Sequence, residues 1–269
     1  MNITTRSRIL MRITALGYLF ILVLLPIVLI LWRTFERGII AFFDSISTPA
    51  AISALNLSLL IVAIVVPLNV IFGVVTAIAL VRGRFPGRGL IQGIVDLPFA
   101  VSPIVVGVSL ILLWGVNGWF GGVENLGFKV IFGLPGMVLA TIFVTLPFVV
   151  REVEPVLHEI GDDQEQAAAT LGASKWQTFW RITLPAIRWG LTYGVVLTVA
   201  RSLGEFGAVI MVSSGFPGVS QTLTLLVHAR YIDDHNTFGA YSAATLLMGI
   251  AVIVLLLMTL LDRKRGATT

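Results

Sequence analysis

Long apolar stretches separated by short polar segments dominate the chain. Each of these stretches is long enough to cross a hydrocarbon core of about 30 Å. They are uniformly apolar and do not alternate with polar residues, which favours helices over the strands of a membrane barrel. The pattern therefore predicts an all-α membrane protein with about six transmembrane helices, at residues 13–32, 55–81, 97–116, 131–150, 189–212 and 240–261.

Composition narrows this picture to one membrane domain over residues 1–269. Hydrophobic residues make up 57% of the chain and charged residues 12%, and the mean hydropathy is +0.98. A soluble domain carries about a quarter charged residues, so no part of the chain is predicted to be a sizeable soluble domain. The absence of cysteine excludes disulfides, thiolate metal sites and a cysteine nucleophile. The three histidines are too scattered to predict a metal site, and no catalytic residue is predicted.

The basic residues predict the orientation in the membrane. With the N-terminus inside, thirteen Lys and Arg residues fall on the cytoplasmic side and four on the outer side, with Arg201 inside a span. Both termini are therefore predicted to be cytoplasmic. The positions of the basic residues fit a membrane topology, so the net positive charge does not predict a nucleic-acid partner. The outer four are Arg33, Arg37, Lys129 and Arg230.

The longest predicted cytoplasmic loop, about residues 151–188, is also the most polar. Its residues 162–171 read as a short helix, since Asp162 and Asp163 suit a helix N-terminus and Gly172 suits its end. A second helical stretch begins at Ser174, and Pro185 is expected to interrupt it before the fifth span.

This loop carries the most specific motif in the chain, EQAAATLGASKWQTFWRITLP over residues 165–185. It resembles the cytoplasmic motif of ABC importer permeases, in which Glu-Ala-Ala is followed by a Gly and then by Ile-x-Leu-Pro. The family's Glu aligns with Gln166, whose amide can hydrogen-bond but brings no charge, while Glu165 lies one residue earlier and is the neighbouring candidate for that charge. The matching residues are Ala167, Ala168, Gly172, Ile182, Leu184 and Pro185.

The resemblance implies a type I ABC importer permease bundle with a cytoplasmic coupling helix in this loop. Two adjacent alanines let a short helix settle closely into a groove on another protein; the alternative is a loop helix that only caps the bundle. The implied partners are a paralogous permease, a dimer of ATP-binding subunits, an extracytoplasmic sulfate-binding protein and membrane lipid. No Gly-x-x-x-x-Gly-Lys-Ser/Thr motif occurs. The chain itself is therefore predicted to be no enzyme and to need no cofactor, with ATP bound and hydrolysed by the partner.

Three further segments resemble the oxyanion branch of these permeases: residues 97–103 (LPFAVSP), 202–208 (SLGEFGA) and 146–152 (LPFVVRE). The last of them is similar to the W-type membrane subunit family of sulfate and thiosulfate importers. The resemblance thus implies a permease subunit for sulfate or thiosulfate in a bacterial inner membrane. The alternatives are a permease for another oxyanion such as molybdate, or a secondary transporter.

Arg201 and Glu205 lie four residues apart inside the predicted span 189–212 and should share a helix face. Charges inside a membrane are costly and mark ion or substrate paths. Together with Ser202 they are candidates for a translocation path or gate; the alternative is a structural pair. Asp96 is expected to cap the third span, and Pro98, Pro103 and Pro147 are candidates for bends in their helices.

Overall fold

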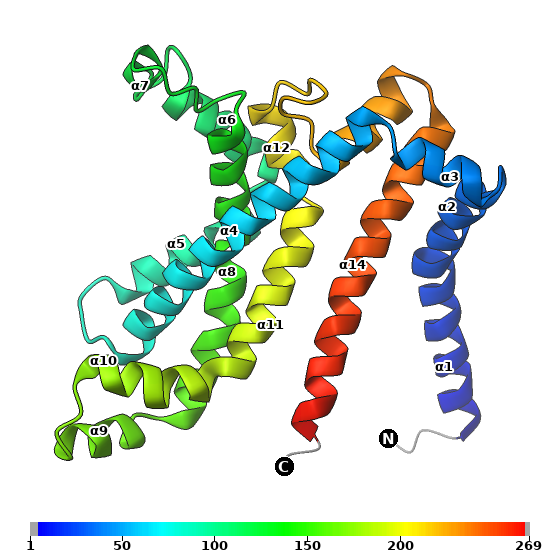
Figure 1. The fold of residues 1–269 in the computed structure, drawn as a ribbon. Helices are drawn as coiled ribbons and strands as arrows, with labels where there is room; N and C mark the ends of the chain where they lie inside the picture. Colours follow the sequence, from blue (N-terminus) through cyan, green and yellow to red (C-terminus); the bar gives the residue numbers. More distant parts are fainter. Residues whose placement is uncertain (1–4, 267–269) are drawn as a thin grey trace.

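The computed structural model describes residues 5–266, and this part of the chain contains helices and no β-strand. Long helices run side by side between two ends of the molecule (Figure 1). Five of them are long and apolar enough to cross a membrane, and a bent pair makes a sixth. The predicted all-α membrane fold is confirmed. The spans are Met11–Phe35, Pro49–Arg82, Leu134–Ile160, Lys175–Leu203 and Thr237–Leu257, with Arg88–Ala100 and Pro103–Trp114 as the bent pair.

The helices follow one another along the chain as short and long segments, three of them π-helical turns labelled η. In order they are α1 (Thr5–Leu19), η1 (Phe20–Leu24), α2 (Leu25–Phe35), α3 (Ile39–Ile46), α4 (Pro49–Arg82), α5 (Arg88–Ala100), α6 (Pro103–Trp114), α7 (Gly122–Asn125), α8 (Leu134–Ile160), α9 (Asp163–Thr170), α10 (Lys175–Thr178), η2 (Phe179–Thr183), α11 (Leu184–Leu203), α12 (Gly207–Val212), α13 (Leu223–His228), η3 (Ala229–Asp233) and α14 (Thr237–Gly266).

The third predicted span, 97–116, is wrong as a continuous helix. α5 and α6 meet at an angle of 113°. Ser102 is extended, with ψ of 135°, because the ring of Pro103 disfavours helical geometry in the residue before it. Pro103 therefore begins α6, as the expected bend implied. Asp96 lies within α5 and caps no helix; its carboxylate pairs with Arg151 of α8 at 2.6 Å.

Two helix ends differ from the predicted span ends. α8 continues to Ile160, ten residues beyond the expected end at 150, so the loop that follows is shorter than 151–188. α11 ends at Leu203, and the chain turns at Gly204 before α12. Helical structure also runs unbroken from Lys175 to Leu203. Pro185 does not interrupt it. Proline has no amide hydrogen to donate to the carbonyl four residues earlier, and the π-helical turn η2 just before it shifts the hydrogen-bond pattern there, so the helix continues.

The interior is built where α4, α8 and α11 pack against one another. Two glycines one turn apart on α11 allow a close approach to α8. A Cβ on Gly190 would lie 2.5 Å from the carbonyl oxygen of Glu152, and one on Gly194 would lie 3.0 Å from the Cα of Val149. Small residues at this spacing are a common device for packing membrane helices. The buried apolar residues beside this contact are Val149, Val150, Val153, Leu157 and Ile187.

The first span stands apart from this interior (Figure 1), and its second half, α2, contacts α14. None of the residues in its most apolar 18-residue window is buried. Near the C-terminal end of α2 the hydroxyls of Thr34 and Thr245 lie 2.8 Å apart and join α2 to α14. The start of α1 and the end of α14 lie at the same end of the molecule as α9.

Candidate functional site

The short helix α9 forms where the sequence predicts it. Asp163 and Glu165 stand in its first turn, where the positive end of the helix dipole stabilises carboxylates. At its other end Gly172 adopts a left-handed φ of +83°. The Gly172 amide donates to the carbonyl of Ala169 and the Ala173 amide to that of Ala168, each at 3.0 Å. This is a Schellman ending, so the prediction that the helix ends at Gly172 is confirmed.

The outward side of α9 is open to solvent. Among its described residues none is buried; Gln166 and Ala167 are exposed and Ala168 is half-buried. Directly after the helix, 88% of Leu171 is exposed, and 70% of Trp176 at the start of α10. The α9 surface, made up of Gln166, Ala167, Ala168, Leu171 and Trp176, thus combines small side chains with two exposed large apolar ones, as in a helix that packs into a groove.

Glu165 points the other way, towards the body of the protein. Its carboxylate accepts a hydrogen bond from Arg82 Nε at 3.1 Å and another from the Thr183 hydroxyl at 2.8 Å. The charge that the sequence places next to Gln166 is therefore engaged within this chain. The other motif residues, Ile182, Leu184 and Pro185, lie in η2 and at the start of α11, outside the α9 surface.

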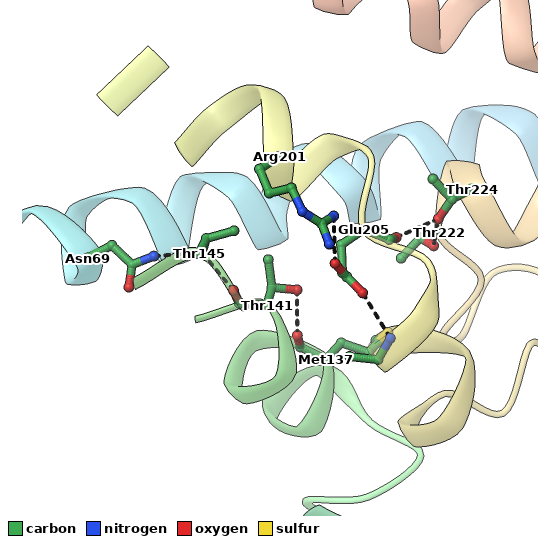
Figure 2. A network of polar contacts seen from close by, with 9 residues as sticks. Asn69, Met137, Thr141, Thr145, Arg201, Glu205, Thr222 and Thr224 are labelled. Atoms are coloured by element: carbon green, nitrogen blue, oxygen red, sulfur yellow. Dashed lines mark hydrogen bonds and ion pairs between the residues drawn. The ribbon is translucent and has the colours of Figure 1, made fainter. Parts of the chain in front are cut away.

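A second polar site lies at the break between α11 and α12 (Figure 2). Arg201 and Glu205 form an ion pair at 2.7 Å, in which the Glu205 side chain is fully buried and that of Arg201 is 34% exposed. The pair is confirmed, but a shared helix face is wrong, because Glu205 lies beyond the end of α11. Its carboxylate accepts the amide of Ala208 at 2.8 Å in the first turn of α12, and its carbonyl accepts the Thr224 hydroxyl.

Beside this pair a chain of buried hydrogen bonds joins α4 to α8 (Figure 2). Asn69 donates through Nδ2 to the Thr145 hydroxyl at 2.7 Å, and Thr145 donates to the carbonyl of Thr141 at 2.6 Å. The Thr141 hydroxyl in turn donates to the carbonyl of Met137 at 2.8 Å. Asn69 was not among the predicted site residues, and its signal in the sequence is an amide in the middle of the apolar run 55–81.

Arg201 and Ser202 line two different cavities. A cavity of about 430 Å³ is lined by the residues of the α5–α6 bend, by Phe148 and by Arg201. Ser202 is buried and lines a cavity of about 10 Å³ with Ser58 and Thr141, room for about one water molecule. Of these two cavities, the one at Arg201 is large enough for a small anion, and a guanidinium lines it.

Comparison with known proteins places the whole chain in one family. Residues 69–266 match the family model described as a binding-protein-dependent transport system inner membrane component. The sulfate transport system permease protein CysW of Synechocystis sp. is 46% identical over 264 residues, which cover 98% of this chain and 95% of that protein. The CysW protein of Escherichia coli K12 is 44% identical over 90% of this chain and 83% of its own length.

Solved structures agree on the fold. A crystal structure of a bacterial ABC transporter involved in the import of the acidic polysaccharide alginate matches with a TM-score of 0.76 at 17% identity, covering 96% of both chains. A crystal structure of bacterial alginate ABC transporter in complex with an alginate pentasaccharide-bound periplasmic protein matches with a TM-score of 0.77 at 16% identity, covering 96% of this chain and 95% of the other. The fold is thus that of ABC importer membrane subunits, and the chain belongs to the family of binding-protein-dependent transport system inner membrane components.

Proposed function

We propose that this chain is a transmembrane permease subunit of an ATP-driven importer for sulfate or thiosulfate and forms half of its translocation path. The observation that carries the proposal is the similarity to sulfate permeases along nearly the entire chain, 46% over 98% of its length in Synechocystis sp.. The likeness to the alginate importer supports the fold alone, because its identity is 17%.

In this proposal the α9 surface docks into a groove on a separate ATPase subunit. The exposed Gln166, Ala167 and Leu171 make the contact, and two ATPase copies drive alternating access by drawing two such helices together. The second helix belongs to a paralogous permease. An extracytoplasmic sulfate-binding protein delivers the anion. The structurally similar alginate transporter has been solved in complex with a periplasmic protein that holds an alginate pentasaccharide. The chain itself binds no ATP.

Arg201 is the proposed attraction point for the anion inside the path. Its guanidinium lines the 430 Å³ cavity at the α5–α6 bend while it pairs with Glu205 on its other side. Because Glu205 partly neutralises the Arg201 guanidinium, Arg201 should attract an oxyanion without binding it tightly. Weak binding of this kind suits an anion that must pass through the path.

The test is uptake by the assembled complex in liposomes, with this chain, its partner permease, the ATPase and the binding protein. We expect sulfate uptake that requires ATP and stops with vanadate. Thiosulfate should compete more strongly than molybdate. Uptake that persists without the ATPase and follows an ion gradient would replace the proposal by a secondary transporter, and stronger competition by molybdate would change the substrate.

Orientation is tested separately. The proposed topology is multi-pass in a bacterial inner membrane, with both termini and α9 in the cytoplasm. Since the chain has no cysteine, Gln164→Cys introduces a single exposed thiol on α9. We expect a membrane-impermeant maleimide to label it only in inside-out vesicles, and labelling of intact spheroplasts would overturn the topology.

A further inference from the structure

Arg82, the last residue of α4, joins three segments of the chain through one guanidinium. Its Nε donates to Glu165 of α9 at 3.1 Å, and one terminal nitrogen donates to the carbonyl of Leu157 at 3.1 Å. The other terminal nitrogen donates to the carbonyl of Gly161. The side chain is four-fifths buried, with 20% exposed.

The two carbonyls belong to the end of α8, where helical backbone acceptors have no partner inside the helix. A cation at this negative end of the helix dipole is stabilised there. Arg82 therefore holds the ends of α4 and α8 together. Glu165 extends the same cluster to the helix that leads into α11, because it also accepts the Thr183 hydroxyl at 2.8 Å.

The remaining connections of α9 to the membrane helices are weak. None of the described α9 side chains is buried, so apolar packing contributes little to holding α9 against the membrane helices. The segment is also flanked by Gly161 and Gly172, both with positive φ, at +63° and +83°. Without the ion pair, a short exposed helix between two glycine turns would swing without moving α4 or α8.

We propose that the Arg82–Glu165 pair is the linkage that transmits displacement of α9 to α4 and α8. The inference rests on the proposed function of α9 as the ATPase docking helix. Both residues act as positioning residues and touch neither the anion nor ATP. The linkage lies between the docking surface and the membrane helices, so its loss should separate ATP hydrolysis from transport and leave both partners bound.

The first experiment uses the full transporter in liposomes with Arg82→Gln, Glu165→Gln and the double variant. We expect the ATPase to co-purify and to hydrolyse ATP at close to the wild-type rate. The amount of sulfate taken up per ATP should fall at least about fivefold, the factor that corresponds to the smallest typical coupling free energy between two sites. The double variant should be no worse than either single one. The matched control is Arg84→Gln, an exposed arginine two residues further along the chain, which should behave like wild type.

A second measurement holds even if the single variants assemble poorly. In Arg82→Cys/Glu165→Cys, a short reducible bis-methanethiosulfonate linker should restore uptake per ATP, and reduction should abolish it in the same sample. Wild-type uptake per ATP in assembled Arg82→Gln, or no gain on linking the two cysteines, would overturn the linkage. Failure of the proposed function itself would look different, because then the wild-type complex would show no ATP-dependent sulfate uptake.

Discussion

Two Arg–Glu pairs connect helices at different levels of this protein, and they differ in sequence distance and burial. Arg201 and Glu205 are four residues apart and the carboxylate is fully buried. Arg82 and Glu165 are 83 residues apart and each side chain is about one-fifth exposed. Burial decides what a pair does for stability, because an unpaired charge costs far more in an apolar interior than near water.

The same comparison separates stability from mechanics. Glu205 also accepts a hydrogen bond from the Ala208 amide, and this buried bond stabilises the first turn of α12. Glu165 links an exposed helix to the ends of other helices. The Arg201–Glu205 pair, with its fully buried carboxylate, should therefore be needed mainly for folding and the Arg82–Glu165 pair mainly for coupling. The following variants test this division from the largest expected effect to the smallest.

Glu205→Ala should have the largest effect. It leaves Arg201 unpaired beside the core and removes the acceptor for the Ala208 amide, so we expect a loss of about 3–5 kcal/mol. The measurement is the unfolding free energy in detergent and the yield of intact chain. Glu205→Gln is the control, because its amide oxygen can still accept from Ala208; if both variants are equally unstable, the capping role of Glu205 is wrong.

Arg201→Ala should cost nearly as much, about 3 kcal/mol, because it leaves the fully buried Glu205 carboxylate without its counter-ion, although Glu205 keeps its bond to the Ala208 amide. The double variant should be more stable than Glu205→Ala yet remain short of wild type by about 1 kcal/mol for the lost cap. If Arg201 attracts the anion, assembled Arg201→Ala complexes should hydrolyse ATP and transport poorly. Transport at the wild-type rate in a well-expressed double variant would leave the pair a structural role only.

Gly172→Val should cost about 1–2 kcal/mol, confined to the loop. The residue has a φ of +83°, which a β-branched side chain adopts poorly, and no neighbouring atom lies within 4 Å of the added Cβ. The membrane helices should unfold at an unchanged temperature while ATPase association or uptake declines. Gly172→Asn is the matched control, since asparagine tolerates this geometry; equal defects in both would point to a contact of the glycine rather than to its backbone.

Glu165→Ala should have the smallest effect on stability, about 1 kcal/mol or less, and salt should reduce it further. Unfolding temperatures at low and high ionic strength measure this, with Glu159→Ala, an exposed residue near the end of α8, as control. A loss as large and as salt-independent as that of Glu205→Ala would remove the distinction between the two pairs.

Local signals along the chain were sufficient for much of the fold. Apolar runs long enough to span a membrane predicted the helices, since hydrogen bonds inside each helix satisfy the backbone in lipid. Carboxylates before a run of alanines, with a glycine after it, predicted α9 and its end at Gly172. The four-residue spacing of Arg201 and Glu205 brought them together even though α11 ends between them, because short spacing keeps two side chains within reach in a helix or a turn.

Contacts between distant segments were decided only by the tertiary structure. Nothing near Arg82 in the sequence indicates Glu165, and in the sequence Arg82 is one of several basic residues at a turn between two apolar runs. Pro185 shows the same limit, because a break was expected there and the helix instead continues after a π-helical turn, whereas the bend at Pro103 was among the expected ones. Proline restricts the backbone in both places, but a proline in the sequence does not tell whether a helix ends before it or continues past a π-helical turn, because the backbone geometry around it is seen only in the three-dimensional structure.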